Sequence, residues 1–487
     1  MPLSSYGRAM AWLAERDADG VALVHGDRRL TRAELERRSN RLARAYQKAG
    51  VRAGDLVTLA LPNCLEFFEA CLACWKLGAT PQPISSKLPQ LERRAIVELA
   101  QPALVVGAPP GEYPARPSLP AGFQPDPALS DSTHPDVTPV NVRAMTSGGS
   151  TGRPKLIIDL TPAQCDPELA ENGMQPGGTT LVPGPLYHAG PFITAWQQLL
   201  CGGTVVLMTR FDARLALELI EKHRVDWVLF VPTMMQRIWR LPEPERLRFD
   251  LSSLRRVMCT GAPSPVWLKR AWIEWIGPEK IYEAYGGTER IAGTLTSGTE
   301  WLERPGSVGR PTGGRRFRIL RPDGSECTTR EIGEVFMLPP GGQGSTYRYV
   351  GAEATATTDG WESLGDLGYL DEDGYLYLVD RKADMIIVGG ANVYPAEVEA
   401  ALDAHAAVRS SAVIGLPDED LGSRIHAIVD APLPVSEEAL REHLGRHLVQ
   451  YKIPKSFEFV SELLRDDAGK VRRSALRAAR LATGGRS

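Results

Sequence analysis

The stretch TSGGSTGRPK, residues Thr146–Lys155, holds three glycines, four hydroxyl residues and a lysine within ten positions. Small residues let successive backbone N–H groups converge on an anion, the hydroxyls add donors, and Lys155 adds a positive charge. This combination predicts a loop that binds a polyphosphate. The loop is not of the Walker type, because no Gly-Lys-Ser/Thr sequence closes it.

The same stretch contains Gly148-x-Ser150-x-Gly152, the pattern of a hydrolase nucleophile elbow. Such an elbow leads directly into a helix, and Pro154, two residues after the last glycine, disfavours a helix there. A serine hydrolase and a glycine loop without function are therefore the two weaker interpretations.

Two further segments carry chemistry only in combination with the first. The segment YEAYGGTER, residues 282–290, would suit a nucleotide contact with a metal-binding Glu289, although alone it is equally typical of a surface turn. In GDLGYLDEDGYLYLVDRK, residues 365–382, the turn DEDG separates Asp366 from Arg381. Two strands joined there would bring both residues to one end, where a carboxylate can accept from ribose hydroxyls. Alone, either residue could be structural.

Composition bounds the class of protein. The 487 residues carry 56 basic and 59 acidic side chains, a net charge of −3, which argues against a nucleic-acid binder held mainly by phosphate contacts. The hydrophobic share of 43% and the charged share of 24% are those of a globular protein, and the length suggests two to four domains. The 47 glycines and 38 prolines indicate many loops.

The N-terminus and the cysteines favour a cytoplasmic protein. The first twenty residues hold no apolar core of signal-peptide length, and the apolar stretch 186–208 contains Gln197 and Gln198, so no membrane span is expected. Seven scattered cysteines point to reduced thiols. Cys71 and Cys74 form a CxxC, but their surroundings have helical apolar spacing, which favours a buried helix over a redox or metal site.

Element patterns predict an α/β fold with a second, smaller domain. Residues 31–49 form a helix with a capping box of Thr31 and Glu34, and strand and helix patterns alternate to about residue 290, as in layered parallel-rich sheets. Short glycine-rich strands follow over 305–380 and predict a small β-rich unit. After Asp380 a strand, a glycine turn, a helix from Pro395, two strands and another helix indicate a separate α+β domain.

The three segments, in this order and spacing, resemble those of the adenylate-forming superfamily, which includes acyl- and aryl-CoA synthetases, peptide-synthetase adenylation domains and luciferases. The likeness extends over nearly the whole chain. Other matching segments are VALVHGDRRLTRAELERRSNRLARAYQKAG, PGPLYHAGP, CTGAPSP, GSVGRP, VGGANVYPAEVEAAL and LLRDDAGKVRRSAL. The resemblance implies an ATP- and acid-binding domain over 1–380 and a mobile domain over 381–487, with a hinge near 381–384.

The resemblance implies activation of a carboxylate as an acyl-adenylate, followed by transfer to a thiol, with ATP, Mg²⁺ and coenzyme A. Binding of the β- and γ-phosphates falls to Ser147, Ser150, Thr151, Gly152 and Lys155. The residues expected to sandwich adenine are Gly261, Ala262, Pro263, Glu283, Ala284 and Tyr285. The resemblance also implies that Thr288 contacts the α-phosphate and that Glu289 binds Mg²⁺. Asp366, assisted by Arg381, is expected to bind the ribose hydroxyls.

Lys470 matches the lysine of the family's C-terminal loop. A cation that bridges an anionic carboxylate and an anionic α-phosphate lowers their repulsion and stabilises the spreading charge. Without the other motifs, Lys470 would be interpreted as a surface lysine. In the second half-reaction the turned domain would offer Gly389 and Gly390 to the pantetheine arm, with His188 near its mouth.

Two departures from the family pattern stand out. Ala383 occupies the pivot, where Asp or Lys is usual, which bears on the energetics of the hinge. The phosphate loop begins Ser147-Gly148-Gly149-Ser150 and has one hydroxyl fewer than usual, so a chain specialised for one half-reaction is a further alternative.

The acid is expected to be bulky and apolar: cyclic, polycyclic or aryl. The family's acyl-pocket segments bring no charged residue here, and Gly286 and Gly287 leave room. The candidates for contact with the acid are Phe192, Trp196, Val231, Met235, Gly286 and Gly287. The stretch SGGSTGRPKLI also resembles that of bile-acid and steroid-type CoA ligases.

An ATP-dependent acid:CoA ligase is the principal hypothesis for this chain. The first alternative is a stand-alone adenylation enzyme that loads a separate carrier protein. The second is a non-catalytic or hydrolytic relic that only binds a nucleotide or an ester. The oligomeric state is open, with a homodimer as one option.

Overall fold

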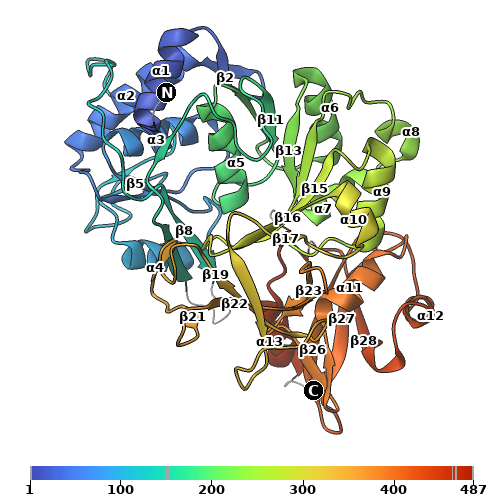
Figure 1. Ribbon diagram of the computed structural model, residues 1–487. Helices are drawn as coiled ribbons and strands as arrows, with labels where there is room; N and C mark the ends of the chain where they lie inside the picture. Colours follow the sequence, from blue (N-terminus) through green and yellow to red (C-terminus); the bar gives the residue numbers. More distant parts are fainter. Residues whose placement is uncertain (1–2, 149–153, 463, 467–468, 485–487) are drawn as a thin grey trace.

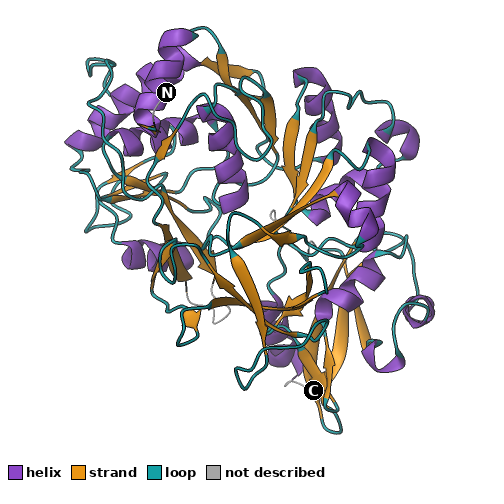
Figure 2. Ribbon diagram, in the orientation of Figure 1, coloured by secondary structure: helices purple, strands orange, loops and turns teal. Residues whose placement is uncertain are grey.

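The computed structural model describes residues 3–148, 154–462, 464–466 and 469–484 (Figure 1). A large N-terminal domain of several sheets is followed by a small α+β domain, as Figure 2 shows by secondary structure. The expected fold class is confirmed, and it follows from the alternation of apolar strand and helix patterns along the first 290 residues.

The largest sheet has nine strands, and its central part is parallel. In sheet order the strands are β17 (Arg310–Pro311), β16 (Gly293–Ser297), β15 (Ile281–Gly286), β14 (Arg256–Cys259), β13 (Trp227–Phe230), β11 (Thr179–Val182), β12 (Thr204–Leu207), β2 (Val21–His25) and β3 (Arg28–Thr31). The helices that accompany it are α5 (Ala189–Leu200), α6 (Ala213–His223), α7 (Pro232–Trp239), α8 (Glu243–Arg246), α9 (Val266–Ile276) and α10 (Gly298–Glu303). Strands such as WVLF are buried throughout, as parallel strands covered on both faces are.

A second, four-stranded sheet is parallel and precedes the glycine-rich loop. Its strands are β5 (Thr80–Pro83), β4 (Leu56–Leu59), β6 (Leu104–Val106) and β7 (Ser118–Leu119). The helices of this region are α1 (Tyr6–Arg16), α2 (Arg32–Lys48), α3 (Leu65–Lys76) and α4 (Gln90–Ala100). The capping box of Thr31 and Glu34 is present at the start of α2. Cys71 and Cys74 are buried in α3 as free thiols, which confirms the expected buried helix.

Three antiparallel groups complete the N-terminal domain. The first is the pair of β1 (Ser4–Ser5) and β10 (Gln164–Cys165). The second joins β8 (Arg143–Gly148), β9 (Pro154–Asp159) and β20 (Tyr347–Val350). The third is the expected β-rich unit, with β18 (Arg316–Leu320), β19 (Gly333–Leu338), β21 (Thr355–Ala356), β22 (Glu362–Leu370) and β23 (Leu376–Arg381).

The small domain has its own core from Ile386 to Phe457. Its strands are β24 (Ile386–Val388), β25 (Ala391–Val393), β26 (Ser410–Asp418), β27 (Gly422–Asp430) and β28 (Ser456–Val460). The helical elements are α11 (Pro395–Asp403), α12 (Glu437–Gly445), a 3₁₀ turn at Gln450–Lys452, and α13 (Arg473–Gly484). Helix α11 begins at Pro395, as the sequence predicts. The end of α11 contacts α7 of the large domain, through Gln236 and Arg240, and the small domain follows the large one at the C-terminal end of the chain (Figure 1).

Within the part of the chain that the structure describes, no helix is both long and apolar enough to cross a bilayer.

Candidate functional site

The glycine-rich stretch joins two antiparallel strands, β8 and β9. The register of this pair places Ser147 opposite Lys155. Ser150, Thr151 and Gly152 lie outside the described residues, so their predicted phosphate contacts stay predictions. Lys155, the second residue of β9, lies at the base of the loop.

Lys155 and Glu289 meet at the Tyr349 hydroxyl. The Lys155 amine donates to that hydroxyl at 2.9 Å, and the hydroxyl donates to Glu289 Oε1 at 2.6 Å. The amine also lies 3.5 Å from Glu289 Oε1 and 4.0 Å from the centre of the Tyr349 ring. Because the Glu289 carboxylate is only 8% exposed, its charge is held by these two partners rather than by bulk water. The structure thus brings the expected phosphate-binding and metal-binding residues together.

The turn that carries Glu289 is held at several points. Thr346 donates to the Glu289 carbonyl oxygen at 2.9 Å, and Arg290, in the left-handed region with φ of 56°, donates to Thr161 at 3.1 Å. A Cβ at Gly287 would lie 2.4 Å from Leu364 Cδ1 and 2.8 Å from Glu289 Oε2, so a larger residue would displace one of these side chains. Gly286 and the half-buried Thr288 occupy the same turn.

The donor set at Glu289 suits Mg²⁺ bound together with phosphates. Among the residues that the structure describes, no cluster of three or more His, Cys, Asp or Glu side chains could enclose a metal ion. Mg²⁺ is usually bound by one or two carboxylates plus substrate phosphates, rather than by a cage of protein ligands. A single buried carboxylate beside a phosphate-binding lysine fits that pattern.

Asp366 and Arg381 face each other across β22 and β23, as the hairpin predicts. Arg381 Nε lies 3.3 Å from Asp366 Oδ1, and the Tyr285 hydroxyl donates to Asp366 Oδ2 at 2.7 Å. Burial raises the pKa of Asp366, whereas Arg381 and the Tyr285 hydrogen bond oppose the rise. These contacts link the ribose candidates to the end of β15, where the adenine candidates lie.

The candidate residues for adenine lie at the ends of two neighbouring strands, β14 and β15, and the Glu283 side chain is the exception. Thr260, just after β14, donates to the Ala284 carbonyl oxygen at 2.7 Å, which joins the loop of Gly261, Ala262 and Pro263 to β15. The Glu283 side chain is turned into the interior instead, where it pairs with Lys269 at 2.5 Å and both side chains are at most 6% exposed. The structure therefore places the Glu283 carboxylate in a buried ion pair, with Ala284 and Tyr285 nearer the loop.

The loop that carries Lys470 docks on the large domain. A Cβ at Gly469 would lie 2.7 Å from Thr233 Oγ1 and 3.4 Å from Val231 Cγ2, at the start of α7. Although the Lys470 side chain is exposed, the protein around it lowers its pKa; Arg381 lowers it further, and Asp466 and Glu289 oppose this. Lys470 therefore shares the electrostatic surroundings of the residues assigned to ribose and metal.

Further contacts join the two domains on the same side. Arg240 at the end of α7 donates to the carbonyl oxygens of Asp403 and Arg409 at 3.0 and 2.7 Å. Gly389 and Gly390 form the exposed turn of the β24–β25 hairpin, and the Gly389 amide donates to Leu421 within the small domain. Gly389 is therefore held by the small domain itself.

The candidates for the acid fall into two places. Phe192 and Trp196 of α5 are at most 2% exposed and pack with α1, α2 and α3 in one hydrophobic core of the large domain, called the first core below. Within it Trp196 lies 4.5 Å from Trp75 and 5.0 Å from Phe68, centre to centre. Val231 and Met235 belong to a second hydrophobic core, around α6, α7 and α9; Val231 packs against the Lys470 loop, and Met235 is fully buried. His188 lies just before α5, half-buried, with its ring 4.5 Å from that of Tyr187.

Sequence reasoning missed Tyr349, Lys269 and Arg290. Tyr349 is 194 positions from Lys155 and 60 from Glu289, and its strand carries no glycine-rich motif. The alternating aromatics Tyr347 and Tyr349 were the available signal, since they indicate a strand with one face turned to Lys155.

Two family models match this chain. Residues 10–344 match the AMP-binding enzyme family, and residues 397–470 match the AMP-binding enzyme C-terminal domain. A feruloyl-CoA synthase of Amycolatopsis is 35% identical, with 95% of this chain and 96% of that one covered. A 2-succinylbenzoate–CoA ligase of Bacillus licheniformis is 32% identical, with 96% and 98% covered.

Among solved structures, o-succinylbenzoate CoA synthetase of Bacillus subtilis in complex with its acyl-adenylate intermediate superposes with a TM-score of 0.82. The identity is 28%, and the likeness covers 98% of this chain and 99% of that one. A double mutant of the same protein, bound with a product analogue, superposes with a TM-score of 0.68 over the same shares.

Proposed function

This chain belongs to the AMP-binding enzyme family and is an acid–thiol ligase of the AMP-forming type, and we propose that its acid is a bulky, apolar aryl acid. ATP with Mg²⁺ and coenzyme A are its cofactor and co-substrate. The observation that carries the proposal is that Lys470 lies within electrostatic reach of Arg381 and Glu289, while Gly469 directly before it packs on Val231 and Thr233.

The first half-reaction joins the carboxylate to the α-phosphate of ATP. A carboxylate oxygen attacks the α-phosphorus, the bond to the bridging oxygen breaks, and pyrophosphate leaves. We propose that the Lys470 amine lies between the two anions and lowers their repulsion. We assign the contact with the α-phosphate to Thr288. Lys155 would hold the departing phosphates, and Mg²⁺ held by Glu289 would neutralise their charge when bound.

The second half-reaction exchanges AMP for the thiol. The sulfur attacks the acyl carbonyl carbon, the bond to the phosphate oxygen breaks, and AMP leaves as the thioester forms. We assign the pantetheine path to Gly389, Gly390 and His188, reached when the small domain turns. We place the domain boundary between residues 380 and 381 and the hinge at 381–384.

Two observations support a turning domain. The same relative superposes at 0.82 in its adenylate complex and at 0.68 in the mutant bound to a product analogue, so the arrangement here is nearer the former. Gly469, with φ of 77°, packs closely on Thr233. This contact suits adenylation, because it keeps the Lys470 loop on the large domain. It would have to break before the β24–β25 hairpin could reach the acid.

The aryl acid is supported by the apolar residues at the start of α7, where Val231 packs against the Lys470 loop. Val231 carries no charge, Gly286 and Gly287 add no side-chain bulk, and Met235, fully buried in α7, would act through packing. Two relatives that align over nearly the whole chain are named for aryl acids, feruloyl and 2-succinylbenzoyl. We propose that Phe192 and Trp196 act through the packing of α5, because both are buried in the first core.

A panel of acids tests the proposal. Hydroxycinnamates, benzoates, bile acids, fatty acids and amino acids are each supplied with ATP, and both pyrophosphate release and thioester formation are measured. Aryl acids are expected to give both products with CoA. Release that leads to a thioester only on a holo-carrier protein would overturn CoA as the acceptor, and turnover confined to amino acids would overturn the acid class.

A further inference from the structure

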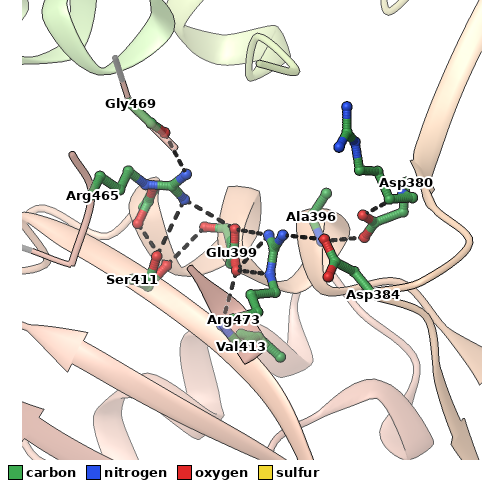
Figure 3. Close-up of polar contacts among 11 residues, drawn as sticks. Asp380, Asp384, Ala396, Glu399, Ser411, Val413, Arg465, Gly469 and Arg473 are labelled. Carbon is green, nitrogen blue, oxygen red and sulfur yellow. Dashed lines mark hydrogen bonds and ion pairs between the residues drawn. The ribbon is translucent and has the colours of Figure 1, made fainter. Parts of the chain in front are cut away.

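The loop that carries Lys470 is anchored on both sides by arginines that bind one buried carboxylate, Glu399 of α11 (Figure 3). Before the loop, Arg465 Nη2 donates to Glu399 Oε2 at 3.0 Å. After the loop, Arg473 donates to both carboxylate oxygens of Glu399, with distances of 2.8 and 2.9 Å from Nη2. The carboxylate is 5% exposed, and the two arginines are 13% and 16% exposed.

The two arginines also bind the backbone of the Lys470 loop and a residue at the start of the small domain. Arg465 Nη1 donates to the Gly469 carbonyl oxygen at 3.3 Å, directly before Lys470. Arg473 Nη1 donates to Asp384 at 2.8 Å, within the proposed hinge segment. Figure 3 shows both contacts as dashed lines.

Glu399 itself is held in place from the opposite side. Its Oε1 accepts from the Val413 amide of β26 at 2.9 Å, and Arg465 donates to the neighbouring Ser411 carbonyl oxygen at 3.2 Å. The carboxylate is thus fixed by a sheet strand as well as by the arginines. Charge-assisted, bidentate contacts of this kind are the strongest and most directional hydrogen bonds that side chains form.

We propose that Glu399 is a positioning residue for Lys470, and this rests on the proposed function. A flexible lysine can bridge a carboxylate and a phosphate only if its backbone is held in place, because a misplacement of about 1 Å can cost on the order of 10²-fold in rate. Because Arg465 and Arg473 bind the same carboxylate, they keep the two ends of the loop at a fixed separation. Glu399 acts on adenylation through them, without touching the substrate.

A purely structural role for Glu399 predicts a different outcome. Loss of a buried ion-pair partner would then weaken the whole small domain and affect both half-reactions alike. Positioning of Lys470 predicts a loss confined to adenylation, because the second half-reaction does not use that amine.

The experiment compares Glu399→Gln with Asp430→Asn in the full chain. Asp430 is the matched control, since it is a buried carboxylate of the same domain that accepts two hydrogen bonds, at 2.7 and 2.9 Å, from Arg409 just before β26 rather than from the arginines that flank Lys470. We expect Glu399→Gln to lower carboxylate-dependent ATP–pyrophosphate exchange by about 10- to 100-fold. The rate of thioester formation from preformed acyl-adenylate should stay within about threefold of the wild-type rate. Asp430→Asn should change the rates of the two half-reactions by the same factor.

A double-mutant cycle gives the second readout. On the Lys470→Ala background, Glu399→Gln should cause little further loss of exchange, because it acts through the removed amine. Equal losses in both half-reactions, or full additivity with Lys470→Ala, would overturn the proposal. If Glu399→Gln does not fold, Arg465→Gln, which frees the Gly469 carbonyl, is judged by the same two criteria.

The wild type separates this inference from the proposed function. If the unmodified chain shows no carboxylate-dependent exchange with any acid, the proposed function fails. If it exchanges and Glu399→Gln does not alter the ratio of the two half-reactions, only the positioning role fails.

Discussion

The Lys155 amine lies 3.5 Å from Glu289 Oε1, and the Tyr349 hydroxyl is hydrogen-bonded to both. Three elements far apart in the sequence therefore share one polar cluster: the base of the glycine-rich loop, the turn after β15, and β20. The phosphate-binding and metal-binding candidates are thus placed relative to each other by a residue that neither motif contains.

Tyr349→Phe is expected to raise the KM for Mg·ATP about tenfold with a smaller effect on kcat. The change removes the hydroxyl that holds Lys155 and Glu289 together but keeps the ring that faces the lysine amine, and it costs at least one charge-assisted hydrogen bond. Pyrophosphate exchange at varied ATP and Mg²⁺ measures it.

Tyr347→Phe on the same strand is the matched control for that prediction. The Tyr347 hydroxyl donates to Glu362 at 2.6 Å, and its ring packs on that of Tyr349 with centroids 4.7 Å apart. Because phenylalanine keeps this ring contact, loss of the hydroxyl should lower stability by about 1–3 kcal/mol and change the KM for Mg·ATP much less than Tyr349→Phe does. Equal KM values for the two variants would show that the Tyr349 hydroxyl does not position the cluster.

Lys470→Ala is expected to lower adenylation by about 10²–10³, the usual cost of losing one donor to the transition state. Thioester formation from a preformed acyl-adenylate should be largely spared, because the amine is assigned to the first step alone. Single-turnover assays of each step, with added adenylate for the second, measure the split. A similar loss in both steps would contradict the role assigned to Lys470.

The adenylation rate is expected to fall at alkaline pH with a midpoint below the ordinary lysine pKa of 10.5. The protein around Lys470 displaces water and lowers the pKa of its amine, and Arg381 lowers it further, so the cationic amine is lost at a lower pH than that of a free lysine. A pH profile of pyrophosphate exchange measures the midpoint.

Arg381→Gln provides the comparison for this profile. It removes a positive neighbour of Lys470, so the midpoint should move to higher pH even if the plateau rate falls. A midpoint that does not move would mean that the alkaline decline reports a different group.

Lys269→Met is expected to destabilise the large domain by about 3–5 kcal/mol, because it leaves the Glu283 carboxylate buried without a cation. Burial raises the pKa of Glu283, while Lys269 opposes the rise. Without Lys269 the carboxylate takes up a proton more readily, so the loss should be smallest at low pH and grow as pH rises.

Urea unfolding of Lys269→Met at pH 5 and pH 8 measures this loss. Lys269→Met combined with Glu283→Gln should recover much of the stability, since no unpaired charge remains. If the single variant kept its stability but lost affinity for ATP, Glu283 would be a nucleotide contact rather than the partner of a buried pair.

Much of this protein could be predicted from local patterns. The capping box predicted helix α2, the glycine turn and Pro395 predicted the end of β24 and the start of α11, and the DEDG turn placed Asp366 opposite Arg381. These features depend on neighbours a few residues apart, whose turn chemistry and periodicity decide the backbone. Alternating strands and helices likewise determined the parallel-rich fold class.

The partners of the site residues were decided only by the tertiary structure. Tyr349 bridges Lys155 and Glu289, Lys269 takes the Glu283 carboxylate into the interior, and Glu399 binds the arginines on both sides of the Lys470 loop. Each pairing joins elements that sheet order and domain docking bring together, and no local pattern specifies such a meeting. A charged side chain seeks a partner where it is buried, and burial is a property of the packed chain.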